Sequence, residues 1–489
     1  MSVAAAWTPG GRSLFSLPAA TARPQRNWIQ WFLIFQVVCQ LFLLTPISGG
    51  PFRSLVRIAA FGMSLVFLAA LPRKGNQPYP AAKAALAVFG ILVISFFNPE
   101  TNSLLSGLAQ IALYVAIMGP LFWVPRLTLD QRAFRVVLFT IWGFYTLSAI
   151  FGILQVYFPG KFQPNVSIMV TSKGNQYLRD LTILVGEGQR VFRPMGLTDT
   201  PGGGGTAGYY AVLLGLGFLL TDRSMFRRFF FCVSMLIGMT CLYLCQVRAL
   251  VVMLGFCLTV FAIMLALRGA KMKLTILLTV VGGVITTAFL WAVSLGGADI
   301  NKRLFLLSND PGKAYYKSRG VFLEYTVNHL LPKYPLGAGL GRWGMMNAYF
   351  GDRSKPSFWV EIQWTGWLLD GGILLILAYV TTLGFAVYTV VKIFRRKDLG
   401  DLWVWAAVLL AYDVGTFANT FSYSCFLSQY GMEFWILNAS LFAAARDGAP
   451  MRWVRRMAPN AVPVEAARFG PQFTPLSAHA HPARPFSGR

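Results

Sequence analysis

The sequence predicts an all-α polytopic membrane protein with about twelve transmembrane helices and both termini in the cytoplasm. Two observations lead to this fold class. Hydrophobic residues make up 56% of the 489 positions and charged residues only 12%, whereas soluble domains carry about 25% charged residues. The Lys and Arg residues also gather in small clusters between long apolar runs. So few charges cannot cover the surface of a water-soluble chain of this length.

The apolar runs follow one another along most of the chain. Residues 1–27 are rich in Ala, Pro and Arg and lack a signal-peptide core, so they form a cytoplasmic tail. The first run, Trp28 to Leu44, is then an uncleaved anchor. Further runs are centred near residues 62, 90, 114, 146, 214, 236, 258, 284, 378, 411 and 436. With its flanks, each run has the roughly 17–25 residues that cross a bilayer as a helix, so residues 28–446 form one transmembrane domain.

The loop charges predict the orientation. With the N-terminus in the cytoplasm every second loop is basic, as expected for loops on that side. These loops contain Arg73/Lys74/Lys83, Arg126/Arg132/Arg135, Arg223/Arg227/Arg228, Arg268/Lys271/Lys273 and Arg395/Arg396/Lys397, and the C-terminal tail is also basic. Arg53 and Arg57, which follow the first helix on the other side, are the exception among the short outer loops. This distribution explains the net charge of +25 without a nucleic-acid partner.

Two long segments, residues 159–206 and 296–362, are predicted to lie outside the cytoplasm. Long ordered loops often carry function, so we expect the chemistry there. Residues 447–489, rich in Pro, Ala and Arg, form a disordered cytoplasmic tail. The six cysteines fall in or beside apolar runs and are interpreted as apolar packing residues. No cluster of His, Cys and carboxylates has metal-ligand spacing, so no metal site is predicted.

The first long loop ends in a motif suited to an anion. Arg193 precedes four glycines, Gly202 to Gly205, that lead into the next helix. Glycines at a helix N-terminus leave backbone N–H groups open to an anion; the alternative is a flexible hinge. Arg248 lies in the short outer turn after the following helix. An arginine there lines a cavity, meets an anion, or extends its side chain to the membrane interface.

The second long loop contributes a third arginine. Arg319 opens the amphipathic stretch from Val321 to Leu330. Three arginines on one side of the membrane suit a pyrophosphate, because a planar guanidinium can bind two oxygens at once. His329, on the same stretch, is interpreted as a packing residue.

A glycine-rich turn and two acids follow. The stretch Pro335 to Gly341 does not come after a strand, so it is interpreted as a tight turn with close backbone approach. Arg342, directly after it, is a fourth candidate pyrophosphate ligand. Glu361 is predicted at the outer mouth of the tenth helix, and Asp370 two to three turns deeper. An acid within a membrane helix suggests a functional site, with a structural salt bridge as the alternative.

The order of these motifs resembles the O-antigen ligase and Wzy-type O-antigen polymerase family. The shared elements, over residues 190–385, are Arg-x-x-Gly (193–196), a single Arg (Arg248), Ser-Arg (318–319), Pro-Leu-Gly-x-Gly-x-Gly (335–341) and acid-x-Gly (370–372). Members are bacterial inner-membrane proteins with about twelve helices and a large periplasmic loop late in the chain. The resemblance therefore implies that both long loops are periplasmic.

The resemblance also implies an activity. It is the transfer of a glycan from a polyprenyl pyrophosphate to an acceptor sugar hydroxyl, without metal, nucleotide sugar or other cofactor. Arginines would neutralise the leaving pyrophosphate and a carboxylate, Glu361 or Asp370, would accept the hydroxyl proton. The implied partners are the lipid-linked glycan, an acceptor glycan or lipid, membrane lipid and polysaccharide export proteins.

One position departs from the family pattern. Its ligases typically carry a His-Asn pair whose histidine lies nine residues before the acid of the acid-x-Gly element. Here Glu361 and Ile362 occupy those positions. The missing histidine favours a polymerase of O-antigen, capsule or exopolysaccharide over a ligase.

A transporter or flippase of a lipid-linked or anionic substrate is the alternative from another class. Twelve helices with both ends in the cytoplasm fit many carriers. Such folds typically contain internal repeats and broken helices at matching positions. The two halves of this sequence show no repeat, which favours glycan transfer.

The predicted orientation can be tested by cysteine labelling in intact cells. A single cysteine at residue 175 or 310, introduced after the six native cysteines are replaced, should react with a membrane-impermeant maleimide because both positions face outward. A cysteine at residue 271 is the inward control. Labelling of 175 or 310 only after permeabilisation of the cytoplasmic membrane would reverse the orientation and remove the basis for a periplasmic reaction.

Overall fold

A long helix covers each of the predicted apolar runs. The computed structural model describes residues 27–45, 50–72, 77–166, 168–171, 174–185, 188–296 and 309–447. The long helices are α1 (Trp28–Leu43), α2 (Gly50–Ala70), α3 (Ala82–Phe96), α4 (Leu104–Met118), α6 (Gln131–Tyr157), α10 (Gly203–Thr221), α11 (Met225–Cys245), α12 (Arg248–Leu267), α13 (Lys271–Gly296), α19 (Gln363–Arg395), α20 (Leu402–Asn419) and α21 (Gln429–Asp447). The predicted tails lie outside the described residues, apart from Asn27, which caps α1, and Asp447.

Short elements fill the turns and the two long outer segments. They are α5 (Pro120–Trp123), η1 (Val124–Arg126), α7 (Pro159–Phe162), α8 (Ile168–Thr171), α9 (Asn175–Asp180), β1 (Thr182–Val185), β2 (Gln189–Phe192), α15 (Pro311–Tyr315), η2 (Tyr316–Gly320), α16 (Val321–Tyr325), η3 (Thr326–Leu330), α17 (Leu331–Lys333), α18 (Gly344–Phe350) and η4 (Cys425–Leu427). The two strands pair antiparallel, with Thr182 opposite Phe192. The second segment is helical from 311 to 333, with π-helical turns at η2 and η3.

The long helices establish a multi-pass membrane architecture. Among the described residues, eight helices are long and apolar enough to cross a membrane, or nine if the bent pair α4 and α5–η1 forms one span. Helices α1 and α3 are apolar but shorter. A multi-pass all-α membrane protein is therefore confirmed, whereas twelve spans and the orientation remain predictions.

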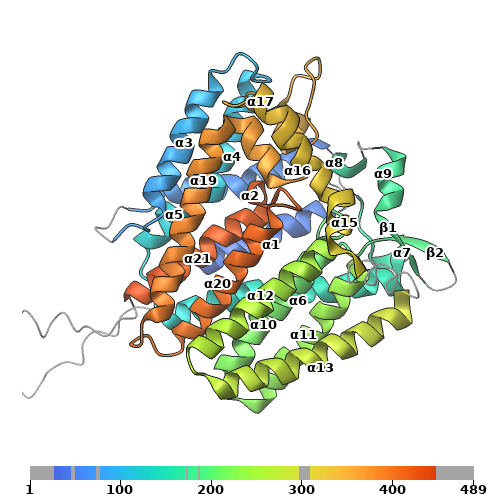
Figure 1. Ribbon diagram of the computed structural model, residues 1–489, viewed down its shortest axis with the longest axis vertical. Helices are drawn as coiled ribbons and strands as arrows, with labels where there is room; N and C mark the ends of the chain where they lie inside the picture. Colours follow the sequence, from blue (N-terminus) through green and yellow to red (C-terminus); the bar gives the residue numbers. More distant parts are fainter. Residues whose placement is uncertain are drawn as a thin grey trace, which may run out of the picture. The chain divides into compact units, whose positions relative to one another are not determined.

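Burial separates the central helices from the peripheral ones. In the most apolar membrane-length stretch of α10, 89% of the residues are buried inside the protein. The corresponding share is 17% in α13 and 11% in α2. Helix α10 packs against α6 and α11, while α19 packs against α3 and α20 (Figure 1). A Cβ on Gly208 would collide with the Gly238 carbonyl oxygen, so glycine lets α10 and α11 approach closely. The exposed apolar faces of α2 and α13 are suited to lipid.

Helix α19 is broken inside its apolar span. Gly371 and Gly372 leave helical geometry, and Gly372 has φ +66° and ψ −158°. The turn at 335–341 fills the break: the Pro335 carbonyl accepts the Ile373 N–H at 3.0 Å, and the Ala338 N–H donates to the Leu369 carbonyl at 2.7 Å. Unpaired backbone groups at membrane depth are costly. The two glycine motifs, more than 30 residues apart in the chain, therefore form one unit.

Replacing Gly372 should destabilise this unit. An alanine Cβ would collide with the Pro335 carbonyl oxygen, and its φ and ψ are essentially restricted to glycine, so Gly372→Ala should cost on the order of 1–3 kcal/mol. Gly384→Ala is the matched control, because nothing lies within 4 Å of its Cβ position on the same helix. The measurement is the fraction of monodisperse protein after heating in detergent. Equal heat resistance of the two variants would show that the break does not hold the fold.

Candidate active site

An ion pair joins two of the predicted site residues. Arg319 Nη1 lies 2.8 Å from Glu361 Oε2, and the two side chains are 35% and 10% exposed. Arg319 belongs to the π-helical turn η2, and Glu361 lies two residues before α19 begins. Single π-helical turns are frequent at functional sites. The structure thus brings a predicted anion ligand, which is partly exposed, together with the predicted base, which is largely shielded from solvent.

Tyr177 connects this pair to the first outer segment. Burial raises the pKa of the Tyr177 hydroxyl, as does the negative charge of Glu361, while the charges of Arg319 and Arg193 oppose the rise. These charges act on one hydroxyl only because the side chains lie in one neighbourhood. The Tyr177 ring also packs edge-on against Trp359, with centroids 5.8 Å apart. The two long segments therefore meet at this cluster.

Local structure holds Arg193 at the end of the β-hairpin. Its N–H donates to the Leu181 carbonyl at 2.9 Å, and its Nη2 donates to the Asp180 carbonyl at 2.8 Å. The next residue, Pro194, accepts a hydrogen bond from the Cys245 thiol at the end of α11. Arg193 therefore lies where the first outer segment meets the α11–α12 turn.

Arg248 lies close to the same place. It is the first residue of α12, three residues after Cys245, and it is partly buried. Its neighbour Val247 lies 3.3 Å from the Cβ position of Gly202. Within the described part of the chain the Arg248 guanidinium makes no hydrogen bond or ion pair. A cation left in this state at the end of a membrane helix is suited to an incoming anion.

The four glycines do not form the expected anion cradle. Gly202 and Gly204 donate their N–H groups to the Pro194 carbonyl at 3.2 and 3.0 Å, and those of Gly203 and Gly205 also meet backbone carbonyls. The prediction of open N–H groups is therefore wrong, because the preceding chain turns back and accepts them. At Gly203, a Cβ would collide with the Thr198 hydroxyl. Glycine is needed here for close packing.

Arg53 and Arg57, the exceptions to the charge rule, hold the loop that contains these glycines. Arg57 Nη2 lies 2.9 Å from the Asp199 carboxylate, and Arg53 Nη1 lies 3.6 Å from it; Asp199 is 6% exposed. Glu361 and Arg57 also lie within electrostatic range of the Tyr423 hydroxyl, after α20. Arg53 and Arg57 departed from the charge pattern of the outer loops, and this departure was the sequence signal that they pair with a carboxylate. Nothing in the sequence pointed to Tyr177 or Tyr423.

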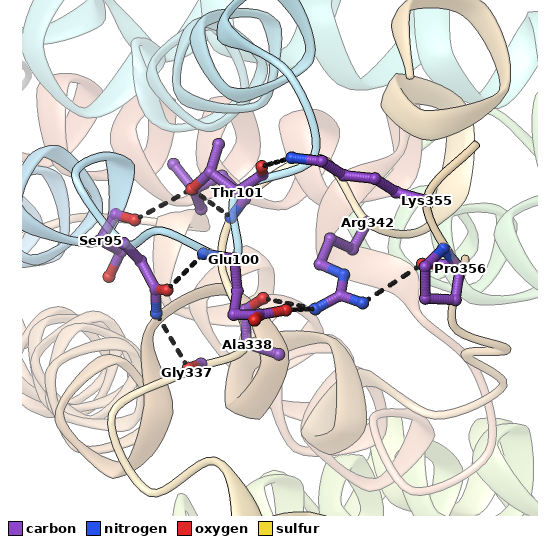
Figure 2. Close-up of polar contacts among 10 residues, drawn as sticks. Ser95, Glu100, Thr101, Gly337, Ala338, Arg342, Lys355 and Pro356 are labelled. Atoms are coloured by element: carbon purple, nitrogen blue, oxygen red, sulfur yellow. Dashed lines mark hydrogen bonds and ion pairs between the residues drawn. The ribbon is translucent and has the colours of Figure 1, made fainter. Parts of the chain in front are cut away.

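Arg342 is engaged in structural contacts. Figure 2 shows its guanidinium between Glu100 and Pro356, with Nη1 2.8 Å from the Glu100 carboxylate and Nη2 3.4 Å from the Pro356 carbonyl. Nη1 also donates to the Ala338 carbonyl at 3.2 Å, and the Phe358 ring lies 4.6 Å from Cζ. Its side chain is 5% exposed. These contacts fasten the glycine turn to the α3–α4 loop, so we assign Arg342 to structure.

Asp370 is likewise enclosed. Its carboxylate accepts hydrogen bonds from the Tyr114 hydroxyl at 2.7 Å, the Trp343 indole at 2.9 Å and the Gln110 amide at 3.0 Å. It is fully buried. Both oxygens are occupied, by donors from α4 and from the segment before α18, so the geometry assigns Asp370 to holding these parts against α19.

His329 has no described contact with the Arg319–Glu361 pair. It is exposed on η3, and its ring contacts Tyr325 at 5.1 Å between centroids. Among the described residues no group of three or more His, Cys, Asp and Glu side chains is arranged to hold a metal ion. The structure thus gathers Arg193, Arg319 and Glu361, with Arg248 nearby. No known family model matches the chain, and no characterised protein aligns with it significantly.

Proposed function

We propose that this protein is a membrane glycosyltransferase that moves a glycan from a polyprenyl pyrophosphate to an acceptor sugar hydroxyl. The reaction would take place on the periplasmic side of a bacterial inner membrane, as in the O-antigen ligases and polymerases that the motif order resembles. The observation that carries the proposal is the Arg319–Glu361 pair at 2.8 Å. It joins an anion ligand to a proton acceptor in the neighbourhood of Arg193.

The arginines would bind the pyrophosphate. Arg319 and Arg193 both act on the Tyr177 hydroxyl, and Arg248 starts α12 beside the same loop. Guanidinium groups match phosphate oxygens two at a time. Fixed positive charge that neutralises the departing pyrophosphate lowers the barrier to breaking its bond to the sugar. Arg342 has no place in this step, because its contacts are structural.

Glu361 would accept the proton. In the substrate-free protein its carboxylate pairs with Arg319. A pyrophosphate that draws Arg319 toward its own oxygens would weaken this pair and make the Glu361 carboxylate a stronger base toward the acceptor hydroxyl. The hydroxyl oxygen then attacks the anomeric carbon, its proton passes to Glu361, and the carbon–oxygen bond to the pyrophosphate breaks with the electron pair on the leaving oxygen.

One observation favours a polymerase over a ligase, and another favours glycan transfer over transport. A glutamate at the position where the family's ligases typically carry histidine supports a polymerase of O-antigen, capsule or exopolysaccharide. A broken membrane helix such as α19 is also typical of transporters, where unwound backbone groups bind ions. Here the Pro335 carbonyl and the Ala338 N–H form hydrogen bonds with the backbone groups at the break, so these groups are not open to an ion. This contact favours glycan transfer over a transporter or flippase.

Conservative arginine substitutions test the anion site. Arg193→Lys, Arg248→Lys and Arg319→Lys each keep a charge but lose the planar fork, so transfer should fall on the order of a hundredfold at normal protein level. Arg342→Lys should instead lower the amount of folded protein. Polymer length on surface-polysaccharide gels and membrane protein level report the two effects. Near-normal polymer in all three site variants would refute the anion site.

Glu361→Gln tests the base. Loss of the carboxylate should reduce transfer by about 10² to 10⁴, whereas His329→Ala should leave transfer nearly unchanged because the His329 side chain is exposed. Transfer from a lipid-linked donor by reconstituted protein is the measurement. Wild-type turnover in Glu361→Gln would remove it as the base, and loss confined to His329→Ala would reassign that role to the histidine.

A further inference from the structure

A cavity lies between α1, α2 and the start of α21. Its volume is about 140 Å³. From α1 it is lined by Gln36 and Gln40, which share a face with the cavity residues Cys39 and Leu43, at the end of the helix predicted to be outside. Arg57 contributes from α2, and Ser428 and Gln429 contribute where α21 begins. None of these side chains takes part in the proton or pyrophosphate chemistry proposed above.

Two of the polar side chains in this cavity are held in place by hydrogen bonds. The Gln36 amide donates to the Ala60 carbonyl at 2.6 Å, and the Gln429 amide donates to Glu433 at 3.3 Å. Each amide keeps its oxygen as an acceptor, and Ser428 carries a hydroxyl. Arg57 adds N–H donors. A wall with fixed donors and acceptors matches sugar hydroxyls, since each of them both donates and accepts.

Arg57 connects the cavity to the candidate active site. Its Nη2 binds Asp199, in the loop that also contains Arg193, and its Nη1 contacts the Met345 sulfur at 3.0 Å. Its charge also acts on the Tyr423 hydroxyl, as does that of Glu361. Arg57, which lines the cavity, and the predicted base Glu361 therefore both lie within electrostatic range of one hydroxyl, so the cavity is in the neighbourhood of the candidate active site.

We propose that this cavity binds a sugar unit of the acceptor glycan. The inference rests on the proposed function and adds the location of the acceptor. An acyl chain is the less suitable occupant, because five of the eleven lining residues are polar or charged: Gln36, Gln40, Arg57, Ser428 and Gln429. The Gln40 amide makes no hydrogen bond within the described part of the chain, so an alkyl chain beside it would leave this amide without a partner, which costs free energy.

Two substitutions on the lining and one control test this site. Ala60→Phe places a ring in the cavity, whereas Ala59→Phe, the neighbouring exposed position on α2, places the same ring outside it. Gln40→Met removes one amide and keeps a side chain of similar size. It tests the cavity independently if Ala60→Phe does not fold. The full-length protein in nanodiscs is mixed with glucose, galactose, mannose, rhamnose or N-acetylglucosamine. Binding is read by saturation-transfer NMR, with decanoate as the apolar probe.

We expect saturation transfer to at least one sugar in the wild type and in Ala59→Phe, and its loss in Ala60→Phe and Gln40→Met. In reconstituted transfer, these two variants should raise the acceptor KM about tenfold and leave the donor KM within about twofold. Sugar binding that survives in both cavity variants, or decanoate binding that only they abolish, would overturn the inference.

The failure of this inference differs from failure of the proposed function. A wild-type protein that transfers glycan without binding any of the sugars through this cavity would overturn the inference alone. A protein that binds sugar in a manner sensitive to Ala60→Phe, yet transfers no glycan from a lipid-linked donor, would support the sugar site and refute the glycosyltransferase.

Discussion

The hydrogen bonds that fill the break in α19 are the constraint on which the site depends. A helix interrupted at Gly371 and Gly372 is tolerable in an apolar layer only if another segment pairs its freed backbone groups. The turn at 335–341 does so through Pro335 and Ala338. Because this turn is fixed, Arg342 can anchor the chain that follows it. That anchoring positions the following segment, which contains Glu361 and leads into α19.

The candidate site forms where the two long outer segments meet. One supplies Tyr177 and Arg193, and the other supplies Arg319 and Glu361. Neither segment could hold these charges in place alone, because the first consists of short helices and a two-stranded hairpin, and the described part of the second consists of helical turns and loop. Packing of Tyr177 on Trp359 joins them.

The arginines show how context separates residues of one type. Arg342 is enclosed by Glu100, two carbonyls and a ring, so both of its terminal nitrogens are engaged within the protein. Arg53 and Arg57 share one largely buried carboxylate, that of Asp199. Arg319 is paired but partly exposed. A pyrophosphate could displace the partner of Arg319 at modest cost, whereas releasing Arg342 would leave a buried charge unpaired.

The sequence by itself determined the membrane architecture and the position of the long helices, because the bilayer requires apolar runs of a set length and loop charges mark their ends. It also marked Arg193, Arg248, Arg319 and Glu361 as candidates. Only the tertiary structure decided that Asp370 and Arg342 are structural, that the glycine N–H groups are occupied, and that Arg57 binds Asp199. The pattern of residues within a segment indicates whether that segment is surrounded by lipid or by water. Which charges pair depends on distances of a few ångströms between segments that are far apart in the chain, and the sequence does not give these distances.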